Sequence, residues 1–114
     1  MLVRRWSIAA GLIVVGAVLA GCSHTAIHGE GVRHEQVIRG TLGINGEDNE
    51  VRVLAGSDVA KLSVLGEDNY VFVEDGARVG KVEIVGEDNH VSLPGTIVVE
   101  FSSIGKDNRL TYRR

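Results

Sequence analysis

The sequence predicts an all-β protein built as a short parallel β-solenoid. Three observations indicate this fold: a turn that recurs four times, apolar residues that alternate with polar ones on both sides of it, and no helical periodicity after the first 21 residues. The turn reads GEDN three times and GKDN once, and its glycines Gly46, Gly66, Gly86 and Gly105 are 20, 20 and 19 residues apart. We therefore expect about four coils of ~20 residues each.

Each repeat contains one strand before this turn and one strand after it. Both strands carry apolar residues two positions apart with mostly polar residues between them, which is typical of strands with one buried face. A second, looser turn follows: AGSD at 55–58, EDGA at 74–77 and Pro94-Gly95, where the only proline avoids a strand interior. The aligned apolar columns are Leu42, Leu62, Val82 and Phe101; Ile44, Val64, Ile84 and the exception Ser103; Val51, Val71, Val91 and Leu110; and Val53, Val73, Leu93 and Tyr112.

The asparagine of the turn favours a solenoid over the alternative, an antiparallel β meander or sandwich. In a solenoid, equivalent turns lie about 4.8 Å apart, so identical side chains form ladders, whereas in a meander they lie roughly 10 Å apart and need not be alike. Asparagine also tolerates the left-handed backbone that such corners require. The residues predicted to form this structural ladder are Asn49, Asn69, Asn89 and Asn108.

The N-terminus predicts export and lipidation. Arg4 and Arg5 precede an apolar run over residues 6–20, which is shorter than the roughly 20 residues of a membrane-spanning helix. The run ends in LAGC, and Cys22 is the only cysteine of the chain. This motif resembles the lipobox of bacterial lipoprotein precursors, which implies cleavage before Cys22 and a lipid on its thiol. The alternatives are a plain secretory signal or a short membrane helix.

These features divide the chain into a signal peptide over residues 1–21, a lipidated tether over 22–36 and a β-repeat domain over 37–114. The tether is expected because residues 23–36 are polar, contain glycine and lack apolar periodicity. Two of the 12 basic residues and none of the 15 acidic ones lie before Cys22, so the remainder is mildly acidic. This charge argues against a nucleic-acid surface, which would be basic.

The lipobox and the GEDNxVxV repeats together resemble a family of small exported bacterial proteins, common in actinobacteria, that is known as the domain-of-unknown-function 3060 family. The resemblance covers residues 37–114 approximately. It implies a short β-solenoid-like domain and no established activity, so no functional residues are carried over from it.

Calcium is the first ligand that the turns suggest, because Asp48, Asp68 and Asp88 offer hard oxygen donors at stacked corners. The unit nevertheless has one turn glycine, and its last copy carries Lys106, which repels a cation. We therefore expect the acidic residues to serve mainly as soluble turn formers, and we expect no cofactor apart from the lipid.

Tyr70 and Phe72 suggest a second ligand, because they alternate with the inward valines and should form an exposed aromatic pair of the kind that lines glycan sites. No catalytic set of nucleophile, base and orienting acid is evident, and the turn carboxylates have no environment that would tune them for acid–base work. We expect a non-enzyme on the extracytoplasmic face of the cell membrane. Its expected role is structural or protein-interacting, with calcium or glycan binding as the alternative and with self-association through the solenoid ends.

Overall fold

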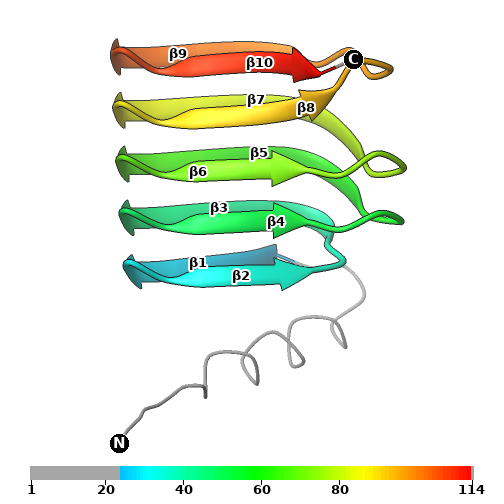
Figure 1. Cartoon of the computed structure of the whole chain (residues 1–114), viewed down its shortest axis with the longest axis horizontal. Coiled ribbons are helices and arrows are strands. Elements are labelled where there is room, and N and C mark those ends of the chain that lie inside the picture. The colour runs from blue at the N-terminus through cyan, green and yellow to red at the C-terminus, as the bar shows by residue number, and fades with distance from the viewer. Residues whose placement is uncertain (1–23, 114) are drawn as a thin grey trace, which may run out of the picture.

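The computed structural model describes residues 24–113, which form a parallel β-solenoid of five coils (Figure 1). Strands β1, β3, β5, β7 and β9 make one sheet, here called the odd sheet, and β2, β4, β6, β8 and β10 make the other, the even sheet. All described pairings between strands are parallel, so the predicted solenoid is confirmed and the antiparallel alternative is wrong. The strands are His24–Glu30 (β1), Arg33–Gln36 (β2), Arg39–Glu47 (β3), Glu50–Val53 (β4), Asp58–Glu67 (β5), Tyr70–Val73 (β6), Arg78–Glu87 (β7), His90–Pro94 (β8), Glu100–Lys106 (β9) and Arg109–Arg113 (β10).

The core is the layer of aliphatic side chains between the two sheets. Parallel pairing in register sets each apolar column directly above its own copies, such as Leu42, Leu62 and Val82. These columns are almost completely buried in the three middle coils. Each coil alone has one apolar face per strand, and only its neighbours above and below remove that face from water, so stability accumulates with stacking.

The recurring turn forms one edge of the solenoid, and its four copies are here called the acidic corners of the second to fifth coils (residues 46–49, 66–69, 86–89 and 105–108). Its glycine has a positive φ, +128° at Gly66, and a Cβ there would lie 1.9 Å from the carbonyl oxygen of Gly46 in the preceding coil. The left-handed residue of the corner is the aspartate, with φ near +57° at Asp48 and Asp88, and not the asparagine as expected. The corner therefore needs glycine for close stacking and a short polar residue for the left-handed step.

The first coil corrects the predicted domain boundaries. Residues 24–36, predicted to be a tether, form β1 and β2 and pair in register with β3 and β4. Their corner is Gly29-Glu30-Gly31-Val32, where Gly31 takes the left-handed position at φ +64°. The solenoid thus has five coils instead of the expected four. The predicted signal peptide and Cys22 lie outside the described residues.

The asparagines tie each acidic corner to the coil before it. Asn69 Oδ1 accepts the backbone N–H of Asn49 at 3.1 Å, and Asn69 Nδ2 donates to the Gly46 carbonyl at 2.9 Å. Asn69 Nδ2 also reaches Asn89 Oδ1 in the next coil at 3.1 Å. The same two backward bonds recur at the other three asparagines, Asn49, Asn89 and Asn108. The ladder therefore connects side chain to backbone as well as amide to amide.

The looser turns form the opposite edge of the solenoid. Ser57 N donates to the Leu54 carbonyl at 3.2 Å around Gly56, whose φ is +90°, which is the glycine position of a type II turn. The buried Ser57 hydroxyl accepts the Ile38 N–H at 2.8 Å, so this edge is also joined to the preceding coil. The connection between β2 and β3 is shorter, and the register shifts between Gly40 and Thr41. These two differences account for the 17 residues between Gly29 and Gly46.

We predict that Gly66→Ala prevents folding. Its Cβ would overlap the Gly46 carbonyl, and the backbone cannot move without breaking the parallel ladder, so the expected cost exceeds about 4 kcal/mol. Gly56→Ala is the matched control, since Gly56 also has a positive φ but nothing lies within 4 Å of its added Cβ, and it should cost only about 1 kcal/mol. Urea unfolding followed by circular dichroism measures both. Equal costs for the two variants would show that close stacking is not the constraint.

We also predict that Asn69→Ala destabilises the protein by about 2–4 kcal/mol, because the buried N–H of Asn49 loses its acceptor and the Gly46 carbonyl loses a donor. Glu67→Ala is the control on the same corner. Glu67 is exposed and lies between the like charges of Glu47 and Glu87, so its removal should leave the melting temperature unchanged or slightly raised. Thermal melts of the two variants test this prediction. Similar decreases in melting temperature would show that the hydrogen bonds of the Asn69 amide do not stabilise the corner.

Candidate binding face

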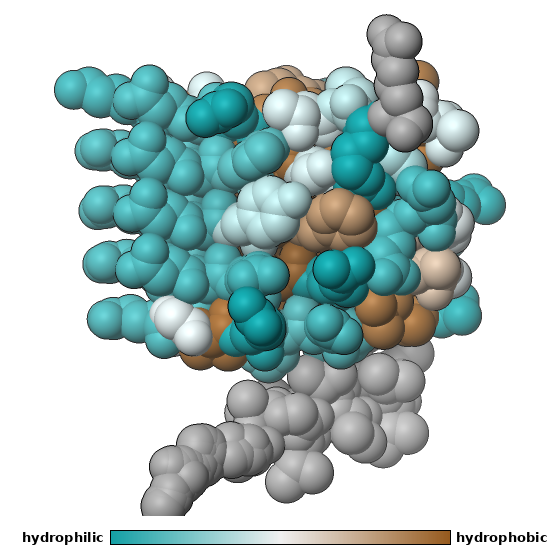
Figure 2. All heavy atoms as spheres, viewed as in Figure 1, coloured by the Kyte–Doolittle hydropathy of each residue, from teal (hydrophilic) through white to brown (hydrophobic). Residues whose placement is uncertain are grey.

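The acidic corners stack as a column of charge along one edge. The strand register places Glu47, Glu67 and Glu87 above one another. Repulsion from Glu47 and Glu87 raises the pKa of Glu67, although the sequence led us to expect no environment that shifts these carboxylates. Figure 2 shows the stacked hydrophilic rows at the left of the molecule. Asp48, Asp68 and Asp88 are exposed at this edge.

The corner amides are not arranged as calcium ligands. Each asparagine Oδ1 already accepts a backbone N–H, and Asn49, Asn69 and Asn89 are buried, at 1% exposure for Asn69. Among residues 24–113, no group of three or more His, Cys, Asp or Glu side chains is placed to hold a metal ion. The corners therefore form a negatively charged edge in which the asparagine oxygens already accept hydrogen bonds from the backbone.

The aromatic pair lies on the outer face of the even sheet. Tyr70 and Phe72 are half-buried on β6, while Val71 and Val73 between and beside them are completely buried in the core. Period-two alternation along the strand thus places both rings on the same side of the sheet. Together with Arg52, His90 and Arg113 they form what is called here the aromatic–arginine face.

Two arginines pack against Phe72. The Arg52 guanidinium carbon lies 4.7 Å from the ring centroid and that of Arg113 lies 4.0 Å away, which is the range of a cation–π interaction. Arg113 belongs to β10, two strands away from β6. It reaches back across β8 because Ser92 is small there, and it donates to the Ser92 hydroxyl at 2.9 Å and to the Val73 carbonyl. Phe72 is therefore held in place by side chains from other coils.

Tyr70 is also held by a side chain of a neighbouring strand, His90 on β8. Its ring meets that of His90 edge to face, with centroids 5.2 Å apart. His90 Nε2 is 2.9 Å from the Thr111 hydroxyl, and burial together with the nearby Arg109 charge lowers the His90 pKa, so the ring is neutral at pH 7. The two aromatic side chains thus belong to a packed cluster that covers four neighbouring strands, β4, β6, β8 and β10.

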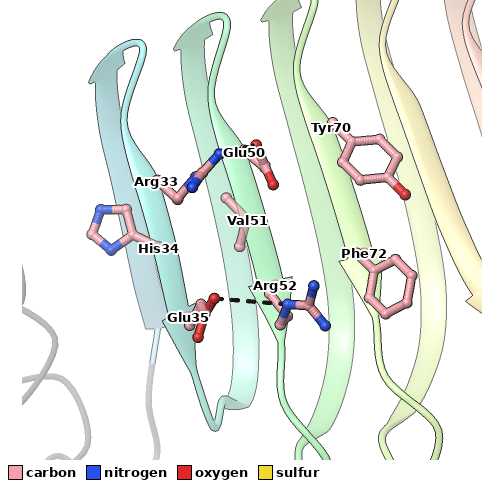
Figure 3. A pocket seen from close by; sticks show the side chains of 8 residues that line it. All are labelled: Arg33, His34, Glu35, Glu50, Val51, Arg52, Tyr70 and Phe72. Carbon is pink, nitrogen blue, oxygen red and sulfur yellow. Dashed lines mark hydrogen bonds and ion pairs between the residues drawn. The ribbon is translucent and has the colours of Figure 1, made fainter.

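A hollow of about 250 Å³ opens beside the rings, toward the N-terminal coils (Figure 3). Its polar rim is formed by ion pairs: Arg33 with Glu50 at 3.2 Å, and Arg52 with Glu35 at 3.8 Å. Both pairs are largely exposed, so they orient side chains more than they stabilise the fold. The lining residues are Arg33, His34, Glu35, Glu50, Val51, Arg52, Tyr70 and Phe72.

A further carboxylate, that of Glu74, pairs with Arg52 and is held by hydrogen bonds. Glu74 accepts the backbone N–H of Ala55 at 3.0 Å and pairs with Arg52 at 3.2 Å, and these bonds lower its pKa. A general acid needs a raised pKa, so the environment of Glu74 is that of a fixed hydrogen-bond acceptor. The arrangement offers apolar ring surface, guanidinium donors and a shallow depression.

Sequence reasoning identified the two aromatic residues but not the residues around them. The partners Arg52, His90 and Arg113 come from different repeats, and only the stacking register brings them together. The alignment of Tyr70 with His90, and of Phe72 with Arg52 and Ser92, was the signal that would have revealed part of this cluster. The contact of Arg113 with Phe72 could not be predicted from the sequence, because the Arg113 side chain extends from β10 across β8 to β6.

Comparison of the chain with family models, with curated proteins and with solved structures gives no match. Within residues 24–113 there is no helix of the length and apolar character that crossing a membrane requires.

Proposed function

We propose that this chain is an exported lipoprotein, anchored by a lipid on Cys22 at the extracytoplasmic face of the cell membrane, whose non-catalytic solenoid binds another component of the cell envelope. The observation that carries the interaction role is the aromatic–arginine face, where two outward rings are fixed by side chains from three coils. A rigid, pre-ordered aromatic surface loses little entropy on binding, which favours recognition of a partner.

The first coil supports a particular placement of the domain. Because β1 begins at His24, only Ser23 separates the predicted lipidation site from the solenoid, so the domain would lie against the membrane surface. β1 starts at the edge opposite the acidic corners, as Figure 1 shows. The negative column then points away from the membrane, which avoids repulsion from anionic lipids.

The anchor is tested by metabolic labelling with an alkyne fatty acid in a bacterial host, followed by membrane fractionation. We expect the wild-type chain to carry the label and to sediment with membranes. Cys22→Ala should lose the label and remain as an uncleaved precursor, because the thiol is the acceptor. Lack of label on the wild-type chain, with the protein recovered as a soluble secreted form, would refute the lipoprotein proposal.

A second candidate function is glycan binding, which the hollow beside Tyr70 and Phe72 favours. Sugar rings present apolar C–H faces that stack on aromatic side chains, and their hydroxyls pair with planar groups such as the guanidinium of Arg52. The exposed ion pairs at the rim supply further donors and acceptors.

Sedimentation with insoluble peptidoglycan tests this function. Tyr70→Ala/Phe72→Ala should reduce the bound fraction by at least about tenfold, since two stacking contacts are worth more than about 1.4 kcal/mol together. Leu65→Ala/Val85→Ala is the matched control, because both side chains are exposed apolar residues on the opposite sheet. Wild-type protein that stays in the supernatant, or equal binding by both double variants, would reject the glycan role.

A further inference from the structure

The C-terminal coil, formed by β9 and β10, leaves its apolar interior uncovered. Phe101 is 42% exposed and Tyr112 is 48% exposed, although their equivalents one coil earlier, Val82 and Leu93, are completely buried. Leu110 is also only partly buried. Within residues 24–113 no strand pairs with the far edge of β9 or β10, so both sheets present unpaired backbone groups there.

The opposite end of the solenoid differs in chemistry. Three of the four interior columns that hold aliphatic residues in the middle coils begin with Thr25, His34 and Gln36 in the first coil, and the fourth begins with the buried Ile27. Val32 occupies the asparagine position, so the first coil has no amide with which to reach back to another coil. A head-to-tail stack would therefore place Phe101 against Thr25 and Tyr112 against Gln36. It would also lack the asparagine bonds that join neighbouring coils within one chain.

A partner that supplies two strands, one in line with each sheet, pairs with both edges and covers the apolar layer between them. A second copy of the C-terminal coil has this geometry, and its apolar residues match those of the first. We propose that this end is the interface of a two-fold symmetric dimer, in which the C-terminal coils of two copies stack on each other.

The direction of the two-fold axis follows from the proposed anchor, and this part of the inference rests on the proposed function. If the axis runs parallel to the strands, β9 of one copy pairs antiparallel with β10 of the other, and both chains begin at the same edge. Both lipids can then enter one membrane. If the axis runs perpendicular to the strands, β9 pairs with β9 and the two chains begin at opposite edges.

The test begins with the mass of the full chain, purified in detergent with Cys22→Ser to remove the native thiol. Light scattering should give two chains per particle. Tyr112→Lys should give monomers, because burying an ammonium group in the interface is unfavourable. Val85→Lys is the control, since Val85 is similarly exposed at 39% but lies on the outer face of the odd sheet, and it should stay dimeric. Circular dichroism verifies that both variants are folded.

Cysteine cross-linking then measures the pairing, independently of any effect on folding. Ser102 and Thr111 lie on the outer faces of β9 and β10, so a mixture of Ser102→Cys and Thr111→Cys chains should give heterodimeric disulfides, and neither variant alone should cross-link. A monomeric wild-type chain, or a ladder of growing oligomers, would overturn the dimer. Cross-linking of Ser102→Cys with itself would overturn the axis. A dimer from a chain that carries no lipid in cells would refute the anchor and leave the interface standing.

Discussion

The asparagine amide at each acidic corner is the interaction on which the stack depends. Where the chain crosses from one sheet to the other, the regular strand ladder stops, and backbone groups inside the corner would be buried without partners. Asn69 satisfies one donor and one acceptor of the preceding coil: its oxygen accepts a backbone N–H and its nitrogen donates to a backbone carbonyl. Glycine at Gly66 brings the coils close enough for these bonds, because a side chain would fill that space. The two residues are thus one structural unit.

This bonding has a direction, and the direction makes the two ends of the molecule unlike. Each asparagine makes its backbone bonds to the coil before it, so the first coil needs no asparagine, and it has Val32. The last coil needs one, and Asn108 bonds to Gly86. Among residues 24–113 no coil follows, and the Asn108 amide also donates to the Ile104 carbonyl of β9, at 3.2 Å. The first coil has polar residues in three of the four interior columns, whereas the last coil has Phe101, Leu110 and Tyr112 in three of them and Ser103 in the fourth.

The difference between middle and terminal coils also decides which parts of the fold could be predicted from the sequence. Middle coils repeat because each has a neighbour on both sides, so their columns, turns and parallel stacking were predictable from residues 37–114. The first coil was missed because a terminus escapes those constraints: Gly31 and Val32 replace the corner pair, and Gln36 replaces a core valine. The aromatic–arginine face was predicted only as the pair Tyr70 and Phe72. The repeat alignment also placed Arg52 and His90 beside these rings, but the contact of Arg113 with Phe72 depends on a long side chain that crosses β8, and no periodicity encodes it.

The surfaces of the solenoid point in separate directions, and this constrains how they can act together. β1 begins two residues after Cys22, the predicted lipidation site. The edge where β1 begins lies opposite the acidic corners, and the even sheet faces sideways (Figure 1). A two-fold axis parallel to the strands places the even sheet of one copy in line with the odd sheet of the other. The two aromatic–arginine faces of a dimer would then lie on opposite flanks, with Arg113 on β10 at the border between each face and the interface. Such a dimer could hold two partners, or two segments of one polymer, beside the same membrane, and a monomer could hold only one.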